Sequence, residues 1–65
     1  MYRLRDLRED HDLNQADIAK LIGTTQQHYS KIETGKADIA GQQLLTLAAY
    51  YGVTTDYLLG RTNHS

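Results

Sequence analysis

The stretch from Asn14 to Gly35 most constrains the fold, because it reads as two short helices joined by a tight turn. Asn14 suits the cap before the first helix, and Asp17 completes a capping-box-like pair. Gly23 ends that helix, because glycine tolerates the left-handed conformation that most residues avoid. The second helix is expected over about residues 26–34 and stops before Gly35. Two amphipathic helices joined by a short glycine-containing turn are typical of a helix-turn-helix.

Three further helices are expected around this pair, at about 2–10, 42–51 and 55–59. In the 42–51 segment five apolar residues form one helical stripe: Leu44, Leu45, Leu47, Ala48 and Tyr51. The other expected core residues are Leu4, Leu7, Ile18, Ala19, Ile22, Tyr29, Ile32 and Val53, with Tyr2 as a further candidate. A single valine in the whole chain argues against a sheet. The sequence therefore predicts an all-α domain of five short helices over residues 1–60, followed by a short tail at 61–65.

Composition limits the classes of protein that remain. The 65 residues suffice for one domain, and the lack of cysteine excludes a disulfide framework and a thiolate metal site. No metal or cofactor is expected elsewhere. No apolar run is long enough to span a membrane, so a soluble, intracellular protein is expected. The net charge of −1 argues against a general polyanion binder but not against DNA binding, because charge placement on one face matters more than the total.

Residues Gln15 to Thr34 resemble the helix-turn-helix of the phage Cro/repressor (XRE) family. The matching positions are the small residue Ala19, the turn residue Gly23, and the apolar residues Tyr29 and Ile32. The resemblance extends over about residues 2–60. It implies a lambda-repressor-like DNA-binding domain whose 26–34 helix enters the major groove of a double-stranded operator. The function it implies is sequence-specific transcriptional regulation, in particular repression.

The outer face of the 26–34 helix carries the candidates for base reading. With Tyr29 and Ile32 directed inward, helical geometry turns the opposite side outward. The outward side chains are Gln27, Ser30, Lys31 and Thr34, with Gln26 at the flank. A glutamine amide matches N7 and the N6 amino group of adenine. The resemblance implies that the base readers are Thr25, Gln26, Gln27 and Lys31. Lysine departs from the family's usual glutamine at that position, and could read a guanine or hold a phosphate.

Phosphate contacts are expected from Gln15, Ser30 and Lys36. Gln15 opens the first motif helix, and in the family the matching glutamine contacts the DNA backbone and braces the reading helix. Lys36 lies in the loop after the second motif helix. Asp38 in the same loop would repel phosphate and weakens this part of the family pattern.

The resemblance also implies a partly buried, structural ion pair between Arg8 and Glu33. The helical angle of Glu33 brings it close to the core, which favours a pair over two separately exposed charges. Tyr29 stands where the family usually has an aliphatic residue. Either its hydroxyl reaches the surface, or the core is rearranged around it.

Other classes of function remain to be compared. An enzyme is not expected, because His11, His28 and His64 are scattered and so short a helical chain leaves little room for a pocket. A protein-interaction module on the same fold, such as an antitoxin with a toxin partner, is the alternative.

A homodimer is expected, because one reading helix covers only a few base pairs. The candidate interface is the apolar group near the C-terminus, Tyr50, Tyr57, Leu58 and Leu59. The alternative is that these residues belong to the core. A bacterial or phage-encoded regulator of this kind is expected in the cytoplasm, associated with the nucleoid.

Overall fold

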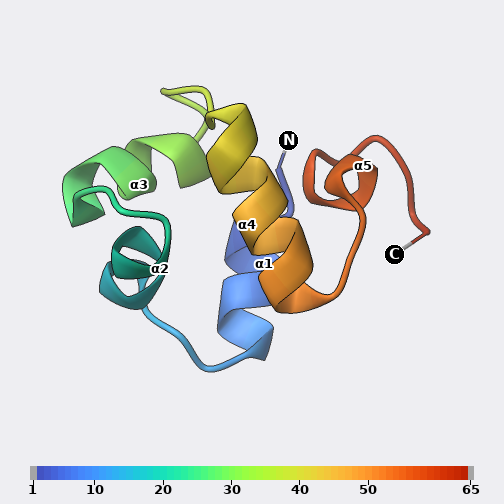
Figure 1. Ribbon diagram of the computed structural model, residues 1–65, viewed down its shortest axis with the longest axis horizontal. Coiled ribbons are helices and arrows are strands. Elements are labelled where there is room, and N and C mark those ends of the chain that lie inside the picture. The colour runs from blue at the N-terminus through green and yellow to red at the C-terminus, as the bar shows by residue number, and fades with distance from the viewer. Residues whose placement is uncertain (1, 65) are drawn as a thin grey trace.

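Five helices and no strand make up residues 2–64, the part of the chain that the computed structural model describes. The helices are α1 (Leu4–Asp10), α2 (Gln15–Leu21), α3 (Gln26–Glu33), α4 (Gly41–Tyr51) and α5 (Thr55–Leu58). Figure 1 shows α4 crossing the middle of the molecule in front of α1, with α2 and α3 on one side and α5 on the other. The prediction of an all-α domain with five short helices is confirmed.

Side-chain caps begin three of the helices. The Asn14 carboxamide accepts the backbone N–H of Asp17 at 2.8 Å, and the Asp17 carboxylate accepts the N–H of Asn14 at 3.1 Å. The hydroxyls of Thr25 and Thr54 each accept a backbone N–H three residues on, at 3.1 Å. These bonds satisfy donors that the first turn of a helix leaves free. Gly23, in the turn between α2 and α3, has a φ of +74°, as its predicted role requires.

Several helix ends differ from the sequence prediction by one or two residues. α4 begins at Gly41 and α5 ends at Leu58, each one residue before the predicted position. α1 begins at Leu4 rather than near residue 2, because the N–H of Arg3 donates to the carbonyl of Leu58 at 2.8 Å. That bond joins the N-terminal segment to α5 instead of extending α1. α3 ends at Glu33, one residue early, and the hydroxyl of Thr34 donates back to two carbonyls of the last turn at 3.0 and 3.3 Å.

One apolar core joins all five helices. Its buried members are Leu4, Leu7, Ile18, Ala19, Tyr29, Ile32, Leu47, Ala48, Tyr51 and Leu58. The predicted core residues Tyr2, Ile22, Leu44 and Val53 are partly buried and pack against this cluster. Because α3 contributes Tyr29 and Ile32 to the core, its opposite side is left free for contacts with another molecule.

Two apolar residues lie where the sequence analysis did not place them. Leu45 was predicted in the core but is 60% exposed, because it stands about 100° around α4 from Leu44, off the buried side. Leu58 was predicted at a dimer interface but is fully buried inside one copy of the chain. The short helix α5 packs on α4 and turns Leu58 into the shared core.

Residues 61–64 stay close to the body of the domain. The N–H of Arg61 donates to the carbonyl of Asp56 at 2.9 Å, and the guanidinium of Arg3 donates to the side chain of Asn63 at 2.7 Å. Within residues 2–64, none of the helices combines the length and the apolar character that crossing a membrane requires.

Candidate nucleic-acid interface

The outer face of α3 is polar and open to solvent. Tyr29 and Ile32 are fully buried and fix the orientation of the helix. The exposed side chains of α3 are Gln26, Gln27, His28 and Lys31. Ser30 is partly buried, and Thr25 is exposed at the N-cap. The four residues predicted to read bases therefore all lie on accessible surface.

Five of the residues predicted to contact DNA meet in one hollow between the start of α2 and the outer face of α3. This α2–α3 groove has a volume of about 470 Å³ and is lined by Gln15, Gln26, Gln27, Ser30 and Lys31. Its lining offers three amides, one hydroxyl and one ammonium group. No carboxylate of the described residues lines it. The groove therefore presents hydrogen-bond donors and acceptors together with a single positive charge.

Thr25 and Lys36, the other two predicted contact residues, lie outside this groove. The Thr25 hydroxyl is engaged in capping α3. The backbone N–H of Lys36 donates to the carbonyl of Lys31 at 2.8 Å, which holds the loop against the C-terminal end of α3. The Lys36 side chain is exposed and forms no ion pair with any residue in the 2–64 range.

Arg8 and Glu33 form the ion pair that the resemblance implied. Nε of Arg8 donates to Oε2 of Glu33 at 2.7 Å, and Nη2 donates to Oε1 at 3.1 Å. The Arg8 side chain is 13% exposed and the Glu33 side chain is 3% exposed. Nη1 of Arg8 also donates to the carbonyl of Leu13 at 2.9 Å. The guanidinium thus links α1, the loop before α2 and the end of α3.

Gln15 contacts the end of α3, as the resemblance implied, through a partner that the sequence did not identify. Its Nε2 donates to Oε1 of Glu33 at 3.4 Å, so Glu33 joins the ion pair to the wall of the α2–α3 groove. Burial alone would raise the pKa of the Glu33 carboxyl, but hydrogen bonds from Arg8 and Gln15 outweigh it and lower that pKa below its ordinary value. The same pairing raises the pKa of Arg8. Glu33 is therefore held as a carboxylate.

The Tyr29 hydroxyl does not reach the surface, which removes one of the two alternatives for this residue. The whole side chain is buried, and its oxygen lies beside Glu33 without a hydrogen bond of standard geometry. Burial and the neighbouring carboxylate raise the pKa of Tyr29, so the phenol stays protonated. The ring is therefore accommodated within the apolar core.

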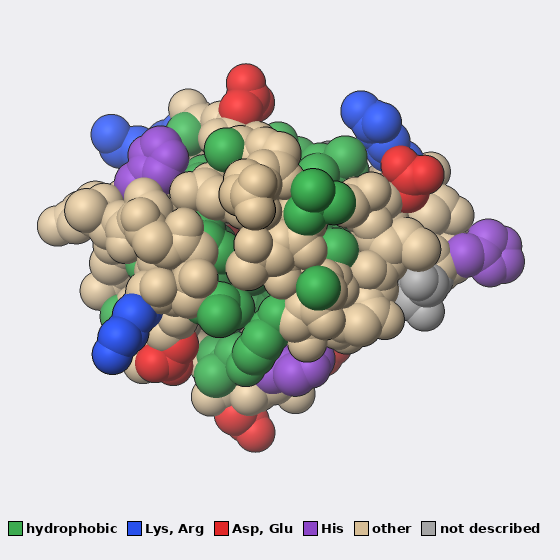
Figure 2. All heavy atoms as spheres, viewed as in Figure 1, with side chains coloured by type: hydrophobic (Ala, Val, Ile, Leu, Met, Phe, Trp, Pro, Cys, Tyr) green, Lys and Arg blue, Asp and Glu red, His purple; other side chains and the backbone are tan. Residues whose placement is uncertain are grey.

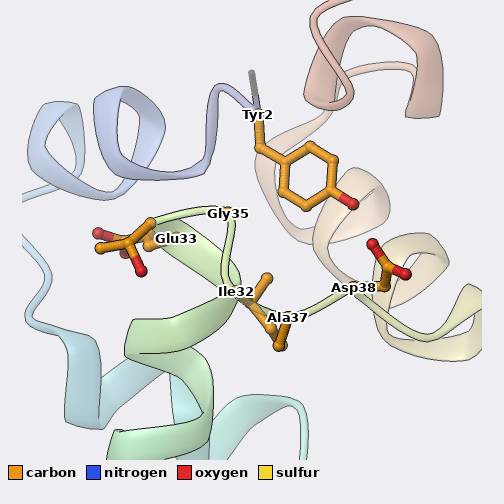
Figure 3. Close-up of a pocket in the computed structure, with 7 residues that line it drawn as sticks. Tyr2, Ile32, Glu33, Gly35, Ala37 and Asp38 are labelled. Carbon is orange, nitrogen blue, oxygen red and sulfur yellow. The ribbon is translucent and has the colours of Figure 1, made fainter.

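A second cavity, of about 310 Å³, opens between the N-terminal segment and the loop after α3. Figure 3 shows the ring of Tyr2 directed toward Asp38, with Ile32 and Ala37 below them and Glu33 on the left. The carboxylates of Glu33 and Asp38 line this cavity and would repel a phosphate group. The cavity therefore fits DNA less well than the α2–α3 groove. Among the described residues, no three His, Asp or Glu side chains come close enough together to hold a metal ion.

Comparisons with known proteins agree with this geometry. The family model described as helix-turn-helix matches residues 4–58, which include all five helices. Two relatives from Bacillus subtilis strain 168 carry the names SPbeta prophage-derived uncharacterized HTH-type transcriptional regulator YonR and uncharacterized HTH-type transcriptional regulator YobD. They are 38% and 36% identical over 61 residues, 94% of this chain. The matches cover 56% and 54% of those proteins, so this chain spans little more than half of their length.

A solved structure gives the same result for the fold. The P22 c2 repressor, determined in complex with a synthetic operator, superposes with a TM-score of 0.82 at 28% identity. The superposition covers 92% of this chain and 91% of the repressor chain. The lambda-repressor-like fold expected from the sequence is therefore confirmed. The family model that matches all five helices and the architecture shared with the P22 c2 repressor show that the chain belongs to the Cro/repressor-type (XRE) family of helix-turn-helix proteins.

Proposed function

We propose that this chain is a sequence-specific DNA-binding transcriptional regulator that places α3 in the major groove. The observation that carries the proposal is the lining of the α2–α3 groove, with its three amides, one hydroxyl and one ammonium group. Mixed donors and acceptors suit the reading of base edges, whereas a purely basic surface binds phosphate without selecting a sequence. The names of the two Bacillus relatives and the operator bound to the P22 c2 repressor support this assignment. No catalytic role is proposed.

The base-reading role falls to residues at the start and on the outer side of α3. Gln26 and Gln27 lie in the first turn, where a helix inserted by its N-terminus meets the base edges. Each amide can donate to N7 of adenine and accept from its N6 amino group, the bidentate geometry that glutamine favours. Thr25 precedes them and suits a contact with a thymine methyl group. Lys31, one turn further on, supplies the one cation among the described residues that line the groove.

Phosphate contacts are assigned to Gln15, Ser30 and Lys36. Gln15 and Ser30 stand at the edges of the α2–α3 groove, and Lys36 lies on the loop beyond α3. Only one of these three is a cation, so the ionic contribution to binding is small. Affinity should therefore fall less steeply with salt than for a strongly basic DNA-binding protein.

A regulator of this type acts by occupying its operator, and repression follows where the site overlaps a promoter. Each half-site requires one α3, and its eight residues span about 12 Å, only a few base pairs. A two-fold dimer would present two such helices to one side of the DNA. We place the protein in the bacterial cytoplasm, at the nucleoid.

The proposed dimer interface lies in the C-terminal part of the chain. Figure 2 shows hydrophobic side chains gathered over the middle of one face, where α4 crosses the molecule, with charged groups mostly at the edge. Tyr50 of α4 is 49% exposed, and Tyr57 and Leu59 are partly buried. The guanidinium of Arg3 lies 4.9 Å from the ring centre of Tyr57 and covers part of it. Tyr50 and Leu59 are therefore the candidates for contact between two copies.

Selection of bound duplexes from a random library tests the proposal directly. The expected result is a recurrent half-site, repeated with two-fold symmetry at a spacing of about one helical turn. Binding to the selected duplex should exceed binding to a scrambled duplex by at least about a thousandfold. A library that returns no recurrent sequence would instead favour the protein-interaction alternative, in which a toxin or another protein is the partner.

A further inference from the structure

Lys31 lies four residues after Gln27 on α3, so the two side chains stand on the same side of the helix, one turn apart. Both line the α2–α3 groove. Lys31 is exposed and forms no ion pair with any residue in the 2–64 range. Its ammonium group is therefore available to a ligand in the groove.

The position of Lys31 favours contact with a base over contact with a phosphate. Lys31 lies in the last turn of α3, on the side that carries Gln27, whereas a loop beyond an inserted helix meets the DNA backbone. Lys31 shares its groove with the amides of Gln26 and Gln27. Lys36, the other exposed lysine of this region, lies on the loop outside that groove.

The chemistry of an ammonium group selects among the four base edges. Lysine offers three donors and no acceptor. In the major groove guanine presents two acceptors, N7 and O6, side by side. Adenine places a donor beside its N7, cytosine presents a donor, and thymine presents a single acceptor, O4, beside its methyl group. We propose that Lys31 reads a guanine, and that this guanine is a specificity-determining base of the operator half-site.

The spacing along α3 places that guanine relative to the adenine assigned to Gln27. Four residues of α-helix rise about 6 Å. Stacked base pairs are about 3.4 Å apart, so the two contacts fall one to two base pairs from each other. The inference rests on the proposed function and adds the composition of the half-site: an A·T pair and a G·C pair, adjacent or separated by one pair.

Duplex selection with three variants tests the proposal. Wild type should select a half-site with a guanine at one fixed position, and substituting that guanine should weaken binding roughly 5- to 150-fold. Lys31→Arg should still select guanine at that position, since arginine makes the same bidentate contact. Lys31→Gln should no longer select guanine at that position and should select adenine instead, while the rest of the selected half-site stays unchanged. Lys36→Gln is the matched control and should weaken all duplexes alike without changing the selected sequence.

The outcomes separate this inference from the proposed function. If wild type selects a recurrent half-site but Lys31→Gln selects the same one, the inference is wrong and sequence-specific binding stands. A uniform loss of affinity for every duplex in Lys31→Gln would assign Lys31 to phosphate and also overturn it. If wild type selects no recurrent half-site, both the guanine inference and the proposed sequence-specific function are wrong. Circular dichroism of each variant should match wild type, because Lys31 and Lys36 are exposed.

Discussion

The Glu33 carboxylate accepts two hydrogen bonds from the Arg8 guanidinium, at 2.7 and 3.1 Å, while the Gln15 amide nitrogen lies 3.4 Å from the same carboxylate. One nearly buried acid therefore joins α1, the end of α3 and the start of α2. Any change at this acid should affect both the stability of the domain and the placement of Gln15, which lines the α2–α3 groove. Loss of either charged partner strands the other in a poorly hydrated site.

Arg8 and Glu33 should couple in a double-mutant cycle. We expect the free energies of unfolding of Arg8→Met, Glu33→Gln and the double variant to give a coupling energy on the order of 1 kcal/mol or more, because the pair is bidentate and largely shielded from water. Urea denaturation supplies the measurement. As a control, Arg5→Met with Glu9→Gln should couple by less than about 0.5 kcal/mol, since that pair is exposed and its atoms are 3.5 Å apart. Additive effects at Arg8 and Glu33 would contradict the structure.

Stability should depend on pH through Glu33. Its pKa is lowered in the folded protein by the hydrogen bonds from Arg8 and Gln15. The stabilisation is therefore complete above the unfolded pKa of about 4.3 and is lost as the pH falls through the lower folded value. The difference in free energy of unfolding between wild type and Glu33→Gln should be constant near neutral pH and shrink below about pH 4. A difference that stays constant into strong acid would mean that Glu33 is not paired.

Gly23 should tolerate no side chain without a cost in stability. A Cβ at this position would meet no atom within 4 Å, so the cost comes from its φ of +74° alone. Gly23→Ala should lower the free energy of unfolding by about 1–2 kcal/mol. Gly41, at the start of α4, is the matched control, since it also has open space but an ordinary helical backbone. Gly41→Ala should be neutral or stabilise by up to about 1 kcal/mol in thermal or urea unfolding.

Two C-terminal substitutions should separate folding from dimerisation. Tyr50 is half exposed, so Tyr50→Asp should preserve the helical spectrum while weakening self-association. Leu58 is fully buried, so Leu58→Asp should cost about 4 kcal/mol or more and unfold much of the population. Sedimentation equilibrium and circular dichroism measure the two effects. A folded Tyr50→Asp variant that dimerises as strongly as wild type would remove Tyr50 from the interface.

Local features of the fold were predictable because they act over three or four residues. The Asn14 cap and the Gly23 turn each follow from a short pattern, and both occur in the structure. The orientation of α3 also followed, because Tyr29 and Ile32 allow only one side of that helix to face inward. The outward placement of Gln27 and Lys31 is a consequence of that orientation.

Features that depend on how helices cross were not predictable. The stripe on α4 admitted Leu45, since periodicity does not fix how wide the buried side is, and the structure leaves that residue exposed. Leu58 was placed on the surface because its burial depends on the return of α5 onto α4. The hydrogen bond from Gln15 to Glu33 joins residues 18 positions apart and depends on the angle between α2 and α3.

The effect of salt should distinguish the two kinds of DNA contact. Gln27 carries an uncharged amide in the α2–α3 groove, so its contribution should depend on the base it faces and hardly on ionic strength. Lys36 is an exposed cation on the loop after α3, so its contribution should be independent of sequence and should fall as salt rises. Binding isotherms over a range of salt concentrations, on the selected duplex and on a scrambled one, measure both quantities.

Gln27→Ala should cost about 1–3 kcal/mol on the selected duplex and little on the scrambled one, with the salt dependence unchanged. Lys36→Ala should weaken binding to both duplexes by similar factors and reduce the slope of log K against log salt by about 0.9, one released counterion. Gln26→Ala combined with Gln27→Ala should abolish most of the preference for the selected duplex, because the two amides occupy the first turn of the inserted helix. If that double variant prefers the selected duplex as strongly as wild type does, α3 does not read bases. The exposed outer face of α3 would then be a surface for another protein.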